Sequence, residues 1–359
     1  MLRRGRTLLI CALTVALTAG AAGANAATVV NSPAPAPSQL VGQLVVAGFS
    51  GAAPSPGLLA RIRQGKVGGI LLYSGNIDAA GTAALATRLQ QAAAAGGQPR
   101  LLIAVDQEGG EVKRLPGAPS LAPDQMETPL IARAQGLATG RNLAANGVTV
   151  DFAPVLDVDH GGFIAPRSFG PTALGVARNG IAFAQGLIQG GVAATVKHFP
   201  GLGYAQTTTD GGPVTVNATK QQLDADLAPF KAAIATHIPI VMVSTAIYPA
   251  LGNTIPAATS KVIIGQLLRV RLGYKGVVIT DSLDTRGVAP YDSPGQAAVQ
   301  AVAAGADLVL EPGAALKHPL ESSDAAYAAL LQAAKTGVLP QPLLLAAYRR
   351  VVTLKQTHS

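Results

Sequence analysis

The sequence predicts an α/β fold, a single-domain (β/α)8 barrel of the TIM type. Eight short runs that are rich in apolar and β-branched residues recur along the chain. Stretches with helical periodicity fill most of the gaps between these runs, so strand and helix alternate. The body of the chain, residues 40–359, also falls within the size range of such barrels.

Most of the eight runs are continuously apolar, as is typical of parallel strands that are covered on both faces. They are Leu44 to Ser50, Gly68 to Ser74, Leu101 to Gly110, Val148 to Val158, Ala193 to Gly201, Pro239 to Thr245, Gly276 to Ser282 and Asp307 to Pro312. An open doubly wound sheet is the alternative fold. It needs fewer strands or a Gly-rich nucleotide-binding turn after the first strand, and VAGFSGAAPSPG matches such a turn poorly.

Residues 1–26 have the pattern of a secretory signal peptide. Three arginines form a positive end, Leu8 to Leu17 form an apolar stretch, and Ala24-Asn25-Ala26 fits a cleavage site. Because the apolar stretch is short for a membrane span, we expect cleavage near Ala26, export and no stable membrane span. Residues 27–39 follow as a Pro/Ala-rich linker that should be extended, and the barrel should occupy residues 40–359.

The charge balance excludes little but favours some partners over others. Without the three arginines of the signal peptide, 24 basic and 19 acidic residues give a net charge of +5. A modest positive balance suits a protein that works near anionic polymers such as cell wall. The chain has no long basic run or aromatic stripe that would indicate nucleic-acid binding. The one cysteine, Cys11, lies in the signal peptide, so we expect a mature chain without thiol chemistry.

Polar residues follow four of the predicted strands, where the chemistry of such barrels takes place. They are Asp106, Glu108 and Arg114 at or just beyond the end of the third run, Asp157, Asp159 and Arg167 at the end of the fourth and in its loop, Lys197 and His198 at the end of the fifth, and Asp281 at the end of the seventh. Each of these residues, taken singly, could have a structural role. Asp281, for example, could cap the next helix. Together at one barrel mouth they indicate a pocket for a polyol ligand, in which an Asp beside a Lys stays ionised, as a nucleophile must.

These segments, in this order, resemble the barrel domain of glycoside hydrolase family 3. The matching stretches include DQEGGEVKRL, DFAPVLDVD, RSFG, KHFPGLG and GVVITDSLD, and the resemblance covers nearly the whole body of the chain. Within the family, the chain resembles most the single-domain bacterial β-N-acetylglucosaminidases, also called β-N-acetylhexosaminidases.

The resemblance implies a retaining mechanism through a covalent glycosyl-enzyme intermediate. By position, Asp281 matches the nucleophile, and the residues that match groups holding the sugar are Asp106, Arg114, Arg167, Lys197 and His198. It implies no metal or organic cofactor, and the five histidines lack metal-ligand spacing. We therefore expect a secreted, monomeric β-glycosidase that removes terminal β-linked N-acetylglucosamine, or a related hexose, from cell-wall-derived glycans.

The chain departs from the family pattern at the general acid, which in the single-domain branch is a His on the loop after the fifth strand. Leu202 stands where the first loop His is expected, and glycine stands at the catalytic position in Asp210-Gly211-Gly212. Asp210 is therefore the candidate acid, which would require partial burial to keep its carboxyl group protonated. Glu108 is another candidate. We expect His160, a further substitute, to be a solvated loop residue instead.

Other hypotheses stay open. The chain could act only on substrates with good leaving groups, or transfer sugar to phosphate or another acceptor instead of water. It could also be a sugar-binding protein that has lost turnover, although a pure binder has no need of Asp281. A phosphate-binding barrel enzyme is the alternative from another class, but Asp281 and Asp284 after the seventh run would repel a phosphate.

Overall fold

The computed structural model describes residue 2 and residues 35–77, 81–313 and 319–358, so the expected signal cleavage site and most of the expected linker lie outside the described residues. Helix α1 (Pro37–Gly42) begins within the last part of that linker. Its first residue is a proline, and the Gln39 side chain accepts a hydrogen bond from the Ala36 N–H at 2.9 Å. The prediction of an extended segment up to Gln39 is therefore wrong for its last three residues, because Pro at a first helical position favours a helix start.

Eight parallel strands form one sheet in the order β10-β1-β2-β3-β6-β7-β8-β9. They are β1 (Val45–Ala47), β2 (Gly69–Leu71), β3 (Leu102–Val105), β6 (Val150–Asp151), β7 (Ala193–Phe199), β8 (Ile240–Val243), β9 (Val277–Thr280) and β10 (Val309–Glu311). A parallel bridge between Ile279 and Leu308, with the Thr280 N–H donating to the Leu308 carbonyl at 3.1 Å, closes the sheet. The predicted (β/α)8 barrel is confirmed, and each predicted run contains one of its strands.

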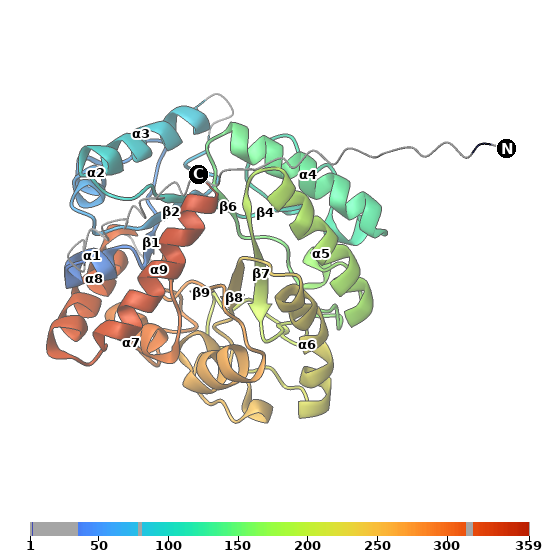
Figure 1. Cartoon of the computed structure of the whole chain (residues 1–359). Coiled ribbons are helices and arrows are strands. Elements are labelled where there is room, and N and C mark those ends of the chain that lie inside the picture. The colour runs from blue at the N-terminus through green and yellow to red at the C-terminus, as the bar shows by residue number, and fades with distance from the viewer. Residues whose placement is uncertain (1, 3–34, 78–80, 314–318, 359) are drawn as a thin grey trace. The chain divides into compact units, whose positions relative to one another are not determined.

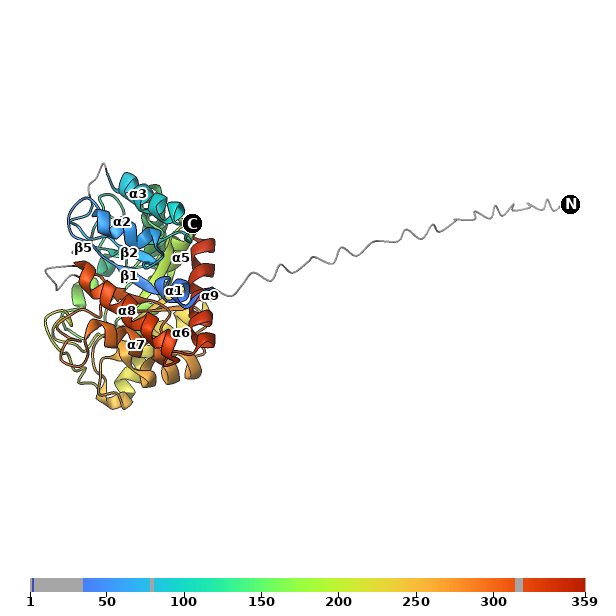
Figure 2. The same ribbon diagram turned by 90° about the vertical axis from the view of Figure 1, so that its left-hand side faces the viewer.

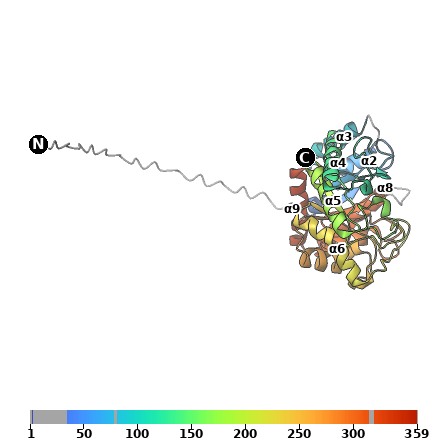
Figure 3. The same cartoon turned by 90° about the vertical axis from the view of Figure 1, so that its right-hand side faces the viewer.

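A helix follows each strand before the next one begins, and Figure 1 shows these helices arranged around the strands. The helices are α2 (Pro56–Arg63), α3 (Thr82–Ala95), α4 (Pro129–Ala145), α5 (Ala173–Gln189), α6 (Lys220–Ala235), the π-helix η5 (Lys261–Arg271), α7 (Pro294–Ala304), α8 (Pro319–Thr336) and the additional α9 (Gln341–Thr357). Short 3-10 turns are η1 (Pro123–Gln125), η2 (Ala165–Arg167), η3 (Pro249–Leu251) and η4 (Ala257–Thr259). Figure 3 shows α4, α5 and α6 packed side by side. Within the described ranges, none of the helices is long and apolar enough to cross a membrane.

The two ends of the barrel differ. Helix α9 crosses the end where the strands begin, and the buried Lys355 ammonium donates to the Gly68 carbonyl at 2.7 Å and to Gln43 Oε1 at 2.6 Å. Apolar side chains from the strands fill the interior and leave a cavity of only about 10 Å³. In Figure 2 the long loops lie on the side opposite α9. The loop end is therefore the one free to form a site.

A short hairpin follows β3 and positions the first polar segment. Its strands are β4 (Gln107–Gly109) and β5 (Val112–Lys113). The third predicted run therefore contains β4 as well as the barrel strand β3, and β5 lies just beyond it. The buried Gln107 side chain accepts from the Arg114 N–H at 2.8 Å and donates to the Leu115 carbonyl at 2.9 Å. These bonds hold the hairpin against the barrel, with Asp106 and Glu108 on either side of Gln107.

Candidate active site

The loop end of the barrel contains a cavity of about 790 Å³. The candidate residues from the sequence that line it are Asp106, Arg114, Arg167, Lys197, His198, Asp210 and Asp281. They come from the ends of β3, β7 and β9 and from the loops after β5, β6 and β7. Residues up to 175 positions apart in the chain thus meet at one mouth, as a parallel barrel requires.

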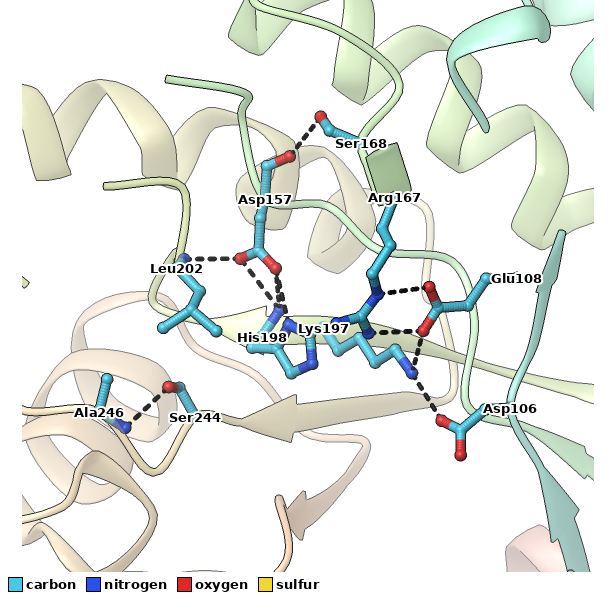
Figure 4. A network of polar contacts seen from close by, with 10 residues as sticks. All are labelled: Asp106, Glu108, Asp157, Arg167, Ser168, Lys197, His198, Leu202, Ser244 and Ala246. Carbon is cyan, nitrogen blue, oxygen red and sulfur yellow. Dashed lines mark hydrogen bonds and ion pairs between the residues drawn. The ribbon is translucent and has the colours of Figure 1, made fainter. Parts of the chain in front are cut away.

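A buried ionic network lies at one side of this cavity (Figure 4). The Lys197 ammonium donates to Asp106 Oδ1 at 2.7 Å and lies 2.6 Å from Glu108 Oε1. The Arg167 guanidinium binds the same Glu108 carboxylate with two hydrogen bonds, of 2.8 Å and 2.7 Å. Lys197 and Glu108 are almost fully buried, whereas 17% of the Asp106 side chain is exposed. Asp106 is therefore the member whose carboxylate can reach a ligand.

The charges of this network determine its protonation. Burial alone would raise the pKa of Glu108, but the positive charges of Lys197 and Arg167 outweigh it and lower that pKa to about 2. Burial would lower the pKa of Lys197, but the carboxylates of Asp106 and Glu108 raise it above its ordinary value. The hypothesis that Glu108 is the general acid is wrong, because a carboxylate held ionised between two cations has no proton to donate near neutral pH.

A second pair orients His198 (Figure 4). The fully buried Asp157 carboxylate accepts from His198 Nδ1 at 2.7 Å and from the Leu202 N–H at 2.7 Å. With Nδ1 occupied, the other ring nitrogen of His198 is available on the cavity side. Through these bonds Asp157 holds both the histidine ring and the start of the loop that follows β7. The peptide bond between Lys197 and His198 is cis.

Asp281 follows β9 directly and is half-buried at the cavity. Its N–H donates to the Val243 carbonyl at 2.8 Å, and its Oδ1 accepts from the Ser282 N–H at 2.8 Å. Burial raises the pKa of Asp281, the nearby Asp210 raises it further, and His198 and Lys197 oppose the rise. The Asp281 carboxylate therefore lies between Lys197 and His198 on one side of the cavity and a second carboxylate, Asp210, on the loop side.

Carboxylates and basic side chains thus line one cavity at the loop end of the barrel, and residues 39–354 match the glycosyl hydrolase family 3 N terminal domain. The chain belongs to this family. A protein of Arthroderma benhamiae that is described as an uncharacterized secreted glycosyl hydrolase is 36% identical over 287 residues, which cover 76% of this chain and 81% of that protein. The beta-hexosaminidase of Bordetella avium is 37% identical over 265 residues, covering 70% of this chain and 75% of the enzyme.

Solved family 3 structures give the same result. A beta-N-acetylglucosaminidase from Paenibacillus superposes with a TM-score of 0.85 at 38% identity and covers 90% of this chain. The beta-N-acetylhexosaminidase of Beutenbergia cavernae superposes with a TM-score of 0.81 at 33% identity, again over 90% of this chain. The chain spans 63% of the Paenibacillus protein and 99% of the Beutenbergia protein. The family resemblance predicted from the sequence is confirmed.

Asp210 is the carboxylate that shares the cavity with Asp281 on the loop side. It lies between β7 and α6, and its Oδ2 accepts from the Thr208 hydroxyl at 3.2 Å. The partial burial that an acid at this position would require is absent in the structure, because Asp210 is exposed. The neighbouring Gly211 and Gly212 have no side chains that could cover it.

His160 does not line the cavity. Its Nε2 lies 3.0 Å from the buried Asp226 Oδ2, and its ring stacks on Tyr204 with the ring centroids 3.8 Å apart. The expectation of a solvated loop residue holds in that His160 is exposed, but only 23% of its side chain is exposed, because Asp226 and Tyr204 contact the ring. His160 therefore contacts the loop after β7 and does not face the cavity.

Several cavity residues were missed from the sequence. They include Tyr73 after β2, the aromatic Phe152 and Phe163, and Arg286, which lies beyond Asp281 on the loop after β9. Tyr73 lies near the end of the second predicted run, and Phe152 follows β6 directly within the fourth, so both were open to the same strand-end reasoning as Asp106. Phe163 and Arg286 carry no sequence signal, because their place depends on how the loops fold. No cluster of His, Cys, Asp and Glu side chains that could hold a metal ion occurs among the described residues.

Replacement of Glu108 by Gln tests the buried network. The pKa of Glu108 lies below its ordinary value, so its contribution to stability is full above about pH 4.5 and is lost as pH falls towards 2. We expect Glu108→Gln to lower the free energy of unfolding at pH 7 by about 3 kcal/mol and to flatten its pH dependence between pH 5 and 3. Urea unfolding at these pH values measures both. Glu127→Gln, at an exposed carboxylate, is the control, and an unchanged pH dependence in Glu108→Gln would contradict the assignment.

Proposed function

We propose that the chain is an exported, retaining β-glycosidase that removes terminal β-linked N-acetylglucosamine from cell-wall-derived glycans, as a monomer with a signal peptide cleaved near Ala26. The observation that carries the proposal is that Asp281 lines the same cavity as the Lys197–Asp106 pair. The sugar follows from the names of the relatives from Bordetella avium, Paenibacillus and Beutenbergia cavernae. The secreted relative from Arthroderma benhamiae supports export.

In this proposal the ionic side of the cavity binds the sugar ring. A sugar hydroxyl donates to the Asp106 carboxylate while its oxygen accepts from the Lys197 ammonium, and the free nitrogen of His198 binds a neighbouring hydroxyl. Arg114 is available in the same way, because no described residue accepts a hydrogen bond from its buried Nε. Charge-assisted bonds of this kind fix the ring and place its anomeric carbon at Asp281.

The reaction proceeds in two displacements. Asp281 attacks the anomeric carbon, the glycosidic bond breaks, and the leaving oxygen takes the proton of Asp210. Asp210, now a carboxylate, then takes a proton from water while the water oxygen attacks the anomeric carbon and releases Asp281. The Ser282 N–H holds Asp281 Oδ1, which leaves Oδ2 for the attack.

Asp210 is exposed in the free protein, so its proton must be favoured by the substrate. A glycan that fills the cavity removes water from around this carboxyl group, and loss of solvation favours the neutral form of a carboxylic acid. In this proposal, Asp210 therefore becomes able to act as the general acid only when substrate is bound.

The exposure of Asp210 and the glycines beside it favour a second candidate, a sugar-binding barrel without hydrolytic turnover. The same features are compatible with transfer of the sugar to phosphate instead of water, since an attacking phosphate needs no base. The two are separated by assaying sugar release with and without inorganic phosphate. Release that requires phosphate supports transfer, and binding without release supports a binding protein.

Replacement of Asp281 by Asn tests the nucleophile. We expect the parent chain to hydrolyse 4-nitrophenyl β-N-acetylglucosaminide, and Asp281→Asn to lower kcat/KM by roughly 10⁴-fold or more, as loss of a covalent nucleophile does elsewhere. The matched control is Asp124→Asn, which makes the same change at an exposed residue of η1 away from the cavity. Equal activity of Asp281→Asn and the parent would contradict the proposed role.

Replacement of Asp210 by Asn tests the acid. A general acid contributes about 10²–10⁴-fold to rate, and it is needed only where the leaving group is a poor one. We expect Asp210→Asn to lower kcat/KM by this factor for diacetylchitobiose but by less than about tenfold for the 2,4-dinitrophenyl glycoside. Steady-state kinetics on the two substrates measure the difference. An equal loss on both would show that Asp210 is not the acid.

A further inference from the structure

The segment between β7 and α6, residues 200–219 and hereafter the acid loop, contributes Leu202 and residues 208–211 to the cavity. Contacts with neighbouring loops therefore determine where Asp210 lies, because the acid loop contains no helix or strand of its own. The loops after β6, β8 and β9 supply such contacts.

The first part of the acid loop rests against the loop after β6. A Cβ atom added to Gly203 would lie 1.9 Å from the Val158 carbonyl oxygen, so only a glycine allows this approach. Tyr204, next along, stacks on His160. These contacts precede Asp210 by several residues and fix the beginning of the acid loop rather than its tip.

The last part of the acid loop pairs with the loop after β8. The Val216 N–H donates to the Ile247 carbonyl at 2.9 Å, and the Ile247 N–H donates to the Val214 carbonyl at 2.9 Å. This short parallel bridge fixes the chain after Asp210. Both ends of the acid loop are therefore anchored, and its tip lies between them.

The tip itself meets Gly287, on the loop that follows β9. A Cβ atom added to Gly287 would lie 2.4 Å from the Thr209 carbonyl oxygen and 3.1 Å from that of Gly212. These two carbonyls flank Asp210 on either side in the chain, and Thr209 is buried. No positive φ requires a glycine at position 287, so the close approach of the acid loop is what excludes a side chain there.

We propose that Gly287 is a positioning residue, which seats the tip of the acid loop so that Asp210 reaches the leaving oxygen. The inference rests on the proposed role of Asp210 as the acid. Gly287 follows the nucleophile Asp281 by six residues on the same loop. One loop thus carries both the nucleophile and the residue that positions the acid, so the distance between the two carboxylates depends on this loop.

The test is Gly287→Ala, whose methyl group would push the tip away from the loop after β9. A shift of about 1 Å in a reacting group costs up to about 10²-fold. We expect kcat/KM for diacetylchitobiose to fall about 10- to 100-fold, while kcat/KM for the 2,4-dinitrophenyl glycoside stays within about threefold of the parent. In the double variant with Asp210→Asn, the alanine should add no further loss on diacetylchitobiose, because the acid it displaces is already absent.

Gly75→Ala is the matched control. It makes the same change in a loop at the same end of the barrel, at a glycine with no atom within 4 Å of an added Cβ and no positive φ. We expect it to match the parent on both substrates. If Gly287→Ala loses its cooperative thermal transition, Thr209→Gly loosens the same tip from the other side, and we expect it to give the same dependence on the leaving group.

The outcomes separate this inference from the proposed function. An equal loss on both substrates in Gly287→Ala, or in Thr209→Gly where that replaces it, would mean that the change disturbs Asp281, and it would overturn the positioning role. An additive loss in the double variant would overturn it as well. If Asp210→Asn itself lacks the leaving-group dependence, the assignment of the acid fails, and with it the role of Gly287. If only Gly287→Ala lacks the dependence on the leaving group, Asp210 keeps its role, and a residue other than Gly287 positions the tip of the acid loop.

Discussion

The ionic network of Asp106, Glu108, Arg167 and Lys197 is the interaction on which the site depends. A buried ammonium or carboxylate is costly unless it is paired and hydrogen-bonded, and here Lys197 and Glu108 are almost fully buried and each meets two opposite charges. The network joins the end of β7 to the β4–β5 hairpin and to the loop after β6. It therefore fixes three segments of the barrel mouth at once and leaves the Asp106 carboxylate directed at the cavity.

The site combines rigid and loop-borne parts. Lys197 and His198 lie on β7, and Asp281 follows β9 directly, so the groups proposed to bind and attack the sugar depend on the hydrogen-bonded barrel. Asp210 lies on a loop whose position depends on contacts with its neighbours. The family resemblance led us to expect histidines on that loop, where this chain has Leu202 and Gly212. A change of acid at this loop leaves the strand-borne groups in place, although the loop after β9 contacts the tip that carries Asp210.

The sequence predicted the barrel and the cavity residues at strand ends, because both follow from local pattern. Continuous apolar runs identify buried parallel strands, and a polar residue at the end of each run must lie at the mouth of a closed barrel. Three features were not predictable in this way: the exposure of Asp210, the ion pairing of Glu108, and the contact of Gly287 with the acid loop. Glu108 became an ion-pair partner because Arg167, 59 residues away, reaches it, and no pattern near either residue indicates that meeting.

The proposed mechanism requires that Asp281 form a covalent bond to the sugar. A 5-fluoro N-acetylglucosaminyl fluoride slows release of such an intermediate, because the second fluorine destabilises the oxocarbenium-like transition state while the first leaves without acid assistance. After incubation of the mature chain with this reagent, peptide mass spectrometry should find one added sugar, on the peptide that contains Asp281. A label on another carboxylate, or inactivation without any label, would contradict the account.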